Sequence, residues 1–407
     1  MAPFVFQDTR FGVALLFIDN PPVNALGADV RAELWRHLEL IEQDDAVVGT
    51  VITSTGRMFS GGGDLREVGQ IDAPGTVGLA QLCQRIEAFP KPVVAALHGR
   101  CIGGGVLLAM ACHARIAAPD ARLMLPELNL GLVPGAGGTQ RLPRLIGVRS
   151  ALDMVIGART LAAAVACTQG LIDDVAEGSL VEAAVLRVQA IVDGNLPWRR
   201  TAALPIEALD TVAKAALLEE FSLLARQVFP GRDAASEAIS LILDADTTTF
   251  DAGCMREREA FTRLATGPQA RALLYLFFAE RALAKSGDAC DADASARITD
   301  RLLSVCGDWV AGQHARGIPA DVIERAVTLT GLRAPPSSSP AIGLGIPADA
   351  AMPSVDNLAQ ELLQVFAEEA RRCLHEGLTN VPGHIDVIAV NACGYPALSG
   401  GPLHHGA

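Results

Sequence analysis

Two glycine-rich segments and the carboxylate of Glu127, all within residues 102–142, constrain this chain more than any other feature. The first segment, Gly103-Gly-Gly105, follows a strand-like run and opens an apolar, helix-like run. The second segment, Pro134 to Arg141, lacks the GK[ST] ending of a phosphate-binding loop, so it predicts a pocket wall instead. Because glycine tolerates positive φ and lets a ligand approach the backbone, both segments are candidates for a binding site.

The composition predicts a large soluble protein. The chain has 407 residues and is 50% hydrophobic, which is enough core for two or three domains. A net charge of −13 and an isoelectric point near 5.1 argue against nucleic acid or an anionic membrane as a partner. No apolar run reaches the roughly 18 residues that a membrane span needs. The first residues lack a signal-peptide pattern, and the nine cysteines form no CxxC pair, so a cytoplasmic location is expected.

Alternating strand and helix patterns predict an α/β domain over residues 1–190. Apolar residues three and four positions apart indicate a helix over 29–43. Short apolar or β-branched runs indicate strands at 13–18, 47–53, 92–97 and 121–125. Strands that alternate with helices are typical of an α/β architecture.

Beyond residue 190 the strand patterns fade and helices are expected. Residues 191–288 are interpreted as a helical linker and residues 289–407 as a separate helical region. The segment 334–354 is rich in proline, serine and glycine, which is typical of a long loop. After it, a helix is expected over 355–377, with Gly377 as its C-cap.

A third glycine-rich turn, Phe59-Ser-Gly-Gly-Gly-Asp64, also follows a strand and is expected to precede a polar helix. Its N–H groups can point at a developing negative charge. Those of Gly103–Gly105 also gain from the N-terminus of the helix that they open. Together the two turns predict a two-donor oxyanion hole, and ordinary strand-to-helix turns are the alternative.

Glu127 is the candidate acid or base. It follows the apolar strand expected at 121–125 and lies between Pro126 and a further apolar segment. A partly desolvated carboxyl group in such a setting suits proton transfer. The alternative is a glutamate that caps a helix or forms a structural ion pair.

Five motifs in this order closely resemble the crotonase, or enoyl-CoA hydratase/isomerase, superfamily. The matching pieces are Asn20-Pro-Pro-Val-Asn-Ala-Leu26, Phe59 to Leu65, Gly103-Gly-Gly105, Pro126-Glu-Leu128 and Pro134 to Leu142. The resemblance implies a ββα spiral fold and an acyl-CoA thioester as substrate. It implies no metal and no redox cofactor, because CoA belongs to the substrate.

The same resemblance assigns roles to individual residues. The N–H groups of Gly63 and Gly104 look like the oxyanion hole for the thioester enolate, and Glu127 falls on the family's second catalytic glutamate. Ala25 and Leu26 lie where the family's backbone contacts the adenine of CoA. The remaining positions expected to line the substrate site are Gly61, Asp64, Leu65, Leu107 and Gly135.

Leu107 is the departure from the family pattern. In hydratases with two catalytic glutamates, the first stands three residues after the middle glycine of the turn, where this chain has leucine. Adding water to a double bond needs a positioned water and a proton donor, whereas one base can move a double bond by taking a proton from C2 and returning it to C4. The sequence therefore favours an isomerase that converts 3-enoyl-CoA to 2-trans-enoyl-CoA.

Several alternatives remain open at this stage. The segment from Pro134 to Leu142 is more typical of hydratases, so enoyl-CoA hydratase is the first alternative, and Leu107 also reads as plain helix packing. A catalytically inactive acyl-CoA-binding or scaffold protein is the second. A thioesterase or decarboxylase, which would use the same oxyanion hole, is the third.

The C-terminal half resembles multifunctional β-oxidation enzymes. Arg256 to Phe261 and Tyr275 to Arg281 look like their linker helix, and motifs from Gly317 onward look like the C-terminal helical domain of 3-hydroxyacyl-CoA dehydrogenases. No strand leads into a GxGxxG turn, and Gly343-Leu-Gly345 lies in the Pro/Ser-rich loop. We therefore expect a multifunctional enzyme without its NAD-binding domain and without dehydrogenase activity, whose helical remnant packs against the first domain. A monomer is expected, with a trimer or hexamer as the alternative.

Overall fold

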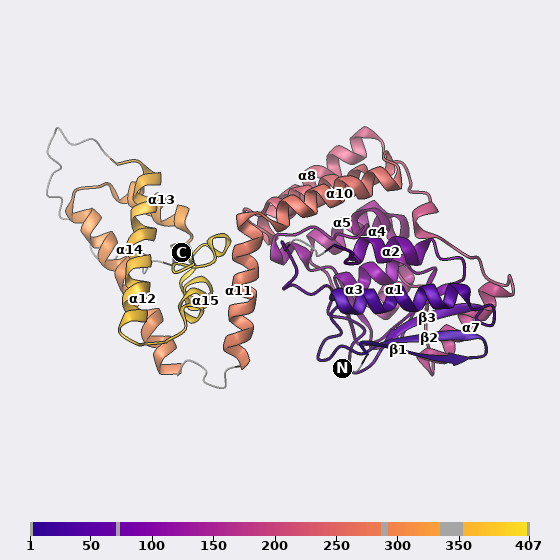
Figure 1. Ribbon diagram of the computed structural model, residues 1–407. Helices are drawn as coiled ribbons and strands as arrows, with labels where there is room; N and C mark the ends of the chain where they lie inside the picture. Colours follow the sequence, from indigo (N-terminus) through magenta and orange to yellow (C-terminus); the bar gives the residue numbers. More distant parts are fainter. Residues whose placement is uncertain (1–2, 71–73, 286–291, 334–352, 405–407) are drawn as a thin grey trace. The chain divides into compact units, whose positions relative to one another are not determined.

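The computed structural model describes residues 3–70, 74–285, 292–333 and 353–404. The chain forms two compact units, Met1–Thr266 and Gly267–Ala407 (Figure 1). This division differs from the three predicted segments, because the helices expected to form a linker are shared between the two units.

The first unit is built on a six-stranded sheet with the strand order β1-β2-β3-β4-β6-β9. β1 and β2 form an antiparallel hairpin, and the other neighbours are parallel. A smaller sheet has the order β5-β7-β8. The strands are β1 (Val5–Arg10), β2 (Val13–Ile18), β3 (Gly49–Ser54), β4 (Val93–Leu97), β5 (Arg100–Ile102), β6 (Ala114–Ala117), β7 (Arg122–Met124), β8 (Leu161–Ala162) and β9 (Asp174–Val175).

Continuous apolar runs explain why the central strands lie inside the unit. β3 and β4 are buried at every position, as expected for parallel strands that are covered on both faces. Helix α7 (Leu180–Val192) packs on β3, β4 and β6 and shares a hydrophobic cluster with them. Helix α1 (Ala28–Gln43) contacts β1 and β2, and helix α2 (Leu79–Glu87) contacts α3 (Gly104–Ala111). The predicted strands and the predicted helix at 29–43 are confirmed to within two residues at either end.

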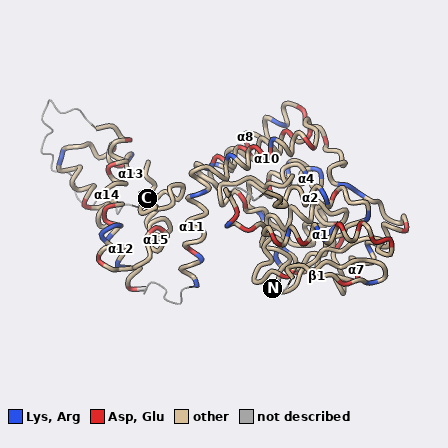
Figure 2. Tube along the Cα trace, in the orientation of Figure 1, with Lys and Arg blue, Asp and Glu red and all other residues tan. Residues whose placement is uncertain are grey.

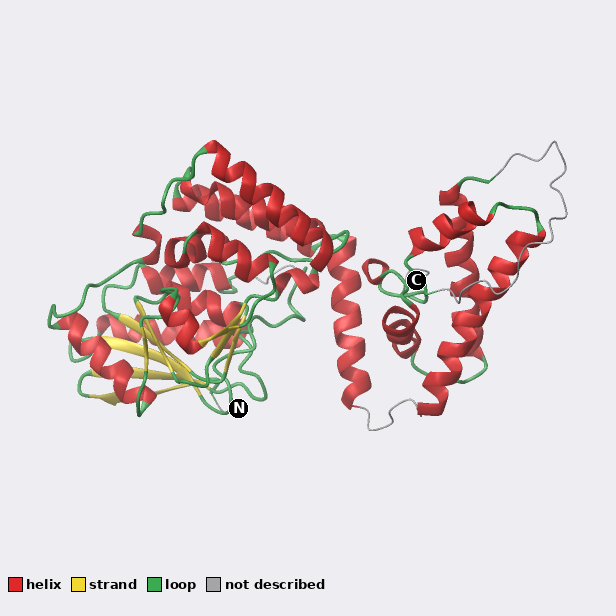
Figure 3. Cartoon of the chain, turned by 180° about the vertical axis from the view of Figure 1, so that it is seen from behind, coloured by secondary structure: helices red, strands yellow, loops and turns green. Residues whose placement is uncertain are grey.

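A layer of helices completes the first unit (Figure 3). Helix α9 contacts α4, α5, α8 and α10, so the segment expected to be a helical linker forms part of this unit as far as residue 266. Acidic and basic residues both occur along α8 and α10 (Figure 2). The helices are α4 (Gly138–Ile146), α5 (Val148–Ile156), α6 (Ala163–Thr168), α8 (Thr211–Val228), α9 (Asp233–Leu243) and α10 (Phe250–Ala265).

In the second unit, the described elements are all helical. They are α11 (Pro268–Lys285), α12 (Ala292–Ala315), α13 (Ala320–Thr330), α14 (Val355–His375), α15 (Pro382–Cys393) and the short 3-10 helix η4 (Ala397–Ser399). The predicted helix at 355–377 is confirmed, and Gly377 has the left-handed φ of +76° that favours glycine after a helix. Gly343 and Gly345, and nearly all of the predicted loop at 334–354, lie outside the described residues.

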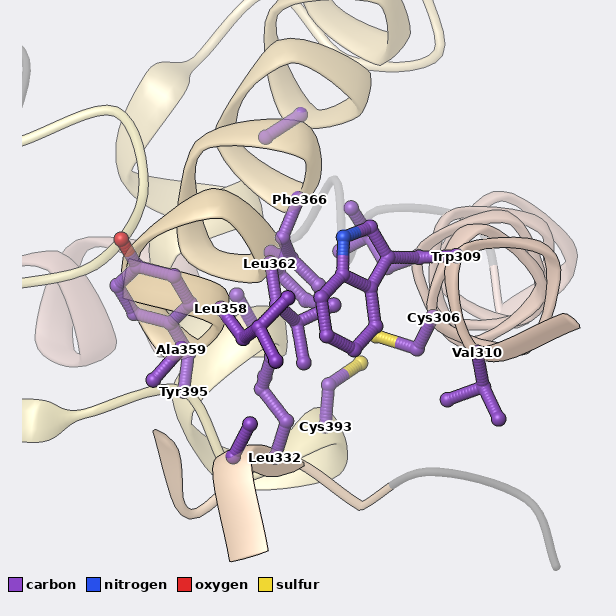
Figure 4. Packing of buried hydrophobic residues seen from close by; sticks show 14 of the residues in the cluster. Cys306, Trp309, Val310, Leu332, Leu358, Ala359, Leu362, Phe366, Cys393 and Tyr395 are labelled. Carbon is purple, nitrogen blue, oxygen red and sulfur yellow. The ribbon is translucent and has the colours of Figure 1, made fainter. Parts of the chain in front are cut away.

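One hydrophobic cluster holds α12 to α15 together (Figure 4). Leu358, Leu362 and Phe366 line one face of α14 at helical spacing and are fully buried. Helix α11 joins this unit through Tyr275, whose hydroxyl donates a 2.7 Å hydrogen bond to the buried carboxylate of Asp386 on α15. Among the helices that the structure describes, none is both long enough and apolar enough to cross a membrane.

Candidate functional site

The structure brings the two predicted oxyanion donors together. Gly104 is the first residue of α3, and a Cβ atom placed on it would lie 2.8 Å from the amide nitrogen of Gly63. A Cβ on Gly62 would lie 3.1 Å from the amide nitrogen of Gly104. In the described part of the chain, neither Gly63 nor Gly104 donates its N–H to a backbone carbonyl. Neither amide is used by a backbone carbonyl, so both can donate to an external acceptor, and a side chain at position 62 or 104 would crowd the neighbouring amide.

The predicted CoA-binding loop lies beside these glycines. Leu26 is bridged to Gly63 as a parallel pair, and its N–H donates a 2.8 Å bond to the carbonyl of Gly62. The Nδ2 group of Asn20 donates to the carbonyl of Ala25 at 2.8 Å. Gly61 is anchored by a 2.7 Å bond from its N–H to the carbonyl of Val23. Ala25, Leu26 and Gly61 thus belong to the same backbone framework as the oxyanion donors.

Sequence reasoning missed the arginine that supports this loop. Arg31 on α1 is buried, and its Nη1 atom donates both to the carbonyl of Leu26 at 2.7 Å and to the carboxylate of Glu67 at 2.8 Å. Its Nε atom donates to the carbonyl of Val77 at 2.6 Å. The available signal was its position three residues before Leu34 on the apolar face of the predicted helix.

Asp64 and Leu65 follow the glycine turn at its exposed end. The Asp64 carboxylate forms an ion pair with Arg66 at 2.6 Å, and hydrogen bonding from that side chain lowers the pKa of Asp64. The polar helix expected after Asp64 is wrong, because residues 65–70 form turns and the next described helix begins at Leu79. The side chain of Asp64 is thus occupied by a local ion pair.

Glu127 opens the short 3-10 helix η1 (Glu127–Leu130) directly after β7. Its Oε1 atom lies 3.0 Å from where a Cβ of Gly103 would be, so the carboxyl group lies against the turn that supplies the Gly104 amide. Its Oε2 atom is buried and has no hydrogen-bond partner among the described residues. Desolvation raises the pKa of Glu127 to about 7, and the nearby charge of Glu257 contributes to the rise. Such a group can both accept and release a proton near neutral pH.

Leu107 lies one helical turn after Gly103 and is almost fully buried. Its Cδ2 atom lies 2.6 Å from where a Cβ of Gly138 would be, so it packs against the first turn of α4. Gly135 in the preceding loop lies against the ring of Phe261, whose Cδ2 atom would be 3.1 Å from an added Cβ. The apolar packing predicted as an alternative for Leu107 is therefore present.

A second buried carboxyl group, which sequence reasoning did not single out, holds this loop. Glu257 on α10 accepts hydrogen bonds from the N–H of Gly137 at 2.6 Å and of Thr139 at 2.8 Å, and from the Thr139 hydroxyl at 2.7 Å. Arg141 forms a buried ion pair with Glu87 at 2.7 Å. The signal for Glu257 was its spacing of four residues from both Gly253 and Phe261, which places all three on one face of a helix.

The comparison with known proteins decides the family. Residues 8–224, more than half of the chain, match the enoyl-CoA hydratase/isomerase family. The chain belongs to that family. An enoyl-CoA hydratase/isomerase from Pseudoalteromonas atlantica T6c has the same fold: it superposes with a TM-score of 0.50 at 23% identity and covers 68% of this chain and 97% of its own. The predicted crotonase fold, followed by a helical C-terminal region, is confirmed.

This enoyl-CoA hydratase/isomerase family member has curated relatives of two kinds. The peroxisomal bifunctional enzyme of Cavia porcellus is 35% identical over 321 residues, which cover 77% of this chain and 44% of that protein. A probable enoyl-CoA hydratase of Bacillus subtilis is 46% identical over 165 residues, covering 39% of this chain and 64% of the relative. The predicted resemblance to multifunctional β-oxidation enzymes is confirmed, and the chain spans less than half the length of the bifunctional relative.

Proposed function

We propose that this chain is an enoyl-CoA isomerase that moves the double bond of a 3-enoyl-CoA to the 2-trans position. The observation that carries the proposal is the setting of Glu127. Its carboxyl group is buried, has one oxygen without a partner among the described residues, and lies beside the turn that supplies the Gly104 amide, which is close to the amide of Gly63. At position 107, where hydratases of this family carry their other glutamate, an apolar side chain packs instead.

The proposed reaction needs one base and one anion site. Glu127 removes a proton from C2 of the substrate, and the electron pair moves onto the thioester oxygen to give a dienolate. The N–H groups of Gly63 and Gly104 hold that oxygen, which is how oxyanion donors lower a barrier. Glu127 then returns the proton to C4, and the double bond ends between C2 and C3. The proposal includes no metal and no redox cofactor, because no electrons leave the substrate.

The alternative function is enoyl-CoA hydratase, favoured by the 46% identity to the Bacillus subtilis relative of that name. Hydration requires a water molecule held by polar groups beside the double bond, and Leu107 offers none. Purified protein assayed side by side on crotonyl-CoA and on a 3-enoyl-CoA, at several chain lengths, distinguishes the two activities. Comparable rates of hydration and isomerisation would refute the argument from Leu107.

The Glu127→Gln variant tests whether the site is catalytic at all. Gln has nearly the same shape and cannot exchange the proton, so isomerisation should fall by roughly 10²–10⁴-fold while acyl-CoA binding persists. Titration calorimetry with a saturated acyl-CoA measures the binding. Wild-type protein that binds acyl-CoA but turns over no enoyl-CoA would support the binding-protein alternative instead.

The Leu107→Glu variant tests the missing carboxylate directly. It should raise hydration of crotonyl-CoA by at least tenfold over wild type, because a second carboxylate can hold water and deliver a proton. Leu107→Gln is the control, since it adds polarity without an acid. An equal gain in both variants would show that polarity alone, and not a second acid, limits hydration.

Three further expectations stay predictions: the cytoplasmic location, the monomeric state and the lack of dehydrogenase activity. The bifunctional relatives are named peroxisomal, and a plant relative from Cucumis sativus is named glyoxysomal. The packing role expected for the C-terminal helices also stays a prediction.

A further inference from the structure

One face of α10 is shaped to fit the loop before α4. Gly253, Glu257 and Phe261 are spaced four residues apart along the helix, so they lie on the same side. A Cβ on Gly253 would overlap the side chain of Gln140, and the Phe261 ring lies against Gly135. Three residues on one face of α10, each about one helical turn from the next, therefore contact the segment 135–140.

The carboxylate of Glu257 caps the N-terminus of α4 from another helix. The first N–H groups of a helix have no partner within it, and a side chain at the N-cap usually accepts one of them. Here the N-cap is Gly137, with a φ of +81° and no side chain to serve. Glu257 instead accepts from the amides of Gly137 and Thr139 and from the Thr139 hydroxyl, although it lies 118 residues further along the chain than Thr139.

Two packing contacts connect this capped turn to the proposed catalytic carboxyl group. Gly138, in the middle of the turn, packs against Leu107 on α3. One helical turn earlier, α3 begins at the glycine pair whose Gly103 lies against the carboxylate of Glu127. A displacement of the capped turn would therefore be transmitted through Leu107 to the helix start that borders Glu127.

Several charged or titratable groups face Glu257. On α4, Arg141 contributes a favourable charge, but it is already paired with Glu87 of α2. The thiols of Cys83 on α2 and Cys254 on α10 are also close enough to feel the charge of Glu257, which is among the causes that raise their pKa.

Glu127 and Glu257 also influence each other. Burial raises the pKa of Glu257 itself to about 7, against the lowering effect of its three hydrogen bonds. The charge of Glu257 in turn contributes to the raised pKa of Glu127.

We propose that Glu257 is a positioning residue for proton transfer: its carboxylate fixes the first turn of α4 against α3 and holds a negative charge near Glu127. The inference rests on the proposed role of Glu127 as the base. The hydrogen bonds that the structure describes for Glu257 all come from the loop and first turn of α4, at Gly137 and Thr139. A negative charge near a carboxyl group favours its protonated form, so the ionised form of Glu257 adds to the effect of burial, which is the main cause of the raised pKa of Glu127.

The Glu257→Gln variant separates this role from a purely structural one. With the charge removed, the acid limb of the pH profile of kcat/KM should move to lower pH by at least ~0.5 unit. Glu259→Gln is the matched control, because it removes the same charge from the exposed side of the same helix and should leave the limb in place. A uniform loss of rate with an unmoved limb would overturn the proposal and leave Glu257 a structural brace.

A second variant and a direct measurement keep the test decisive if Glu257→Gln folds poorly. Thr139→Val removes one donor to the carboxylate but keeps both backbone bonds, so it should move the limb in the same direction by a smaller amount. The proton affinity of Glu127 can also be read by ¹³C NMR of carboxyl-labelled glutamate, with its signal assigned by loss in Glu127→Gln. That titration needs no turnover. If the pKa read from the Glu127 signal is the same in the variant as in wild type, the role of Glu257 is overturned. If that pKa shifts but the protein has no isomerase activity, only the proposed function is overturned.

Discussion

At the scale of single residues, the buried carboxyl group of Glu127 should lower the stability of the fold that holds it once it ionises. A buried carboxylate loses its hydration, and the hydrogen bond that Glu127 receives from its own backbone N–H replaces only part of it, since Oε2 has no partner among the described residues. Desolvation therefore raises the pKa of Glu127 to about 7 from the ordinary 4.5. Between these values an unfolded chain releases the proton while the folded protein keeps it, so stability declines as the pH rises from about 4.5 to about 7.

Replacing this residue should therefore stabilise the protein at alkaline pH. Glu127→Gln carries no charge at any pH, so the free energy of unfolding should exceed that of wild type by about 1–3 kcal/mol at pH 8 and by little at pH 5. Urea unfolding at the two pH values measures the difference. The exposed variant Glu259→Gln provides the baseline, and a gain that is equal at pH 5 and pH 8 would contradict the burial argument.

At the scale of elements, sequence patterns predicted where the helices and strands lie better than they predicted which distant residues contact them. The strands at 13–18 and 92–97 and the helix at 29–43 follow from local hydrophobic patterns, and the structure confirms them. The juxtaposition of Gly63 and Gly104 came from the family resemblance, because nothing local joins residues so far apart. Arg31 and Glu257 were missed because their roles depend on backbone groups supplied by distant segments. Patterns along one element report which face is buried, and they do not report what covers it.

The contact between α10 and α4 can be tested by replacing glycine with alanine at one packed position and at one exposed control position. In Gly253→Ala, the added Cβ would lie 2.1 Å from Oε1 and 2.5 Å from Cδ of Gln140, a side chain that donates to the carbonyl of Leu241. The variant should lower stability by about 1–3 kcal/mol. Gly312→Ala in α12 is the matched control, because its Cβ meets nothing within 4 Å and should stabilise the helix by roughly 0.5–1 kcal/mol. Thermal unfolding of both variants reports the contrast, and a stabilised Gly253→Ala would show that α10 does not pack this closely.

At the scale of the whole molecule, the boundary between the two units determines which helices belong to the proposed site. A division at residue 190 would leave the loop before α4 without Glu257 and Phe261. A division after Thr266 retains both, together with α8, α9 and α10. Every residue proposed to bind or transform the substrate lies in Met1–Thr266. The second unit has its own hydrophobic cluster among α12 to α15 and its own link between Tyr275 and Asp386.

Truncated fragments distinguish a domain boundary at residue 190 from one after Thr266. A fragment of residues 1–266 should fold cooperatively and keep isomerase activity within a few-fold of the full chain, because it contains every residue proposed for the site together with α8, α9 and α10. A fragment of residues 1–192 ends with α7 and exposes the apolar surface that α8 to α10 normally cover, so it should aggregate or lose activity. Circular dichroism melting and kcat/KM on a 3-enoyl-CoA measure both fragments. Equal activity in the two would place the boundary near residue 190 after all. If 1–266 is folded but inactive, and activity returns when 267–407 is added, then the helices of the second unit contribute to the site.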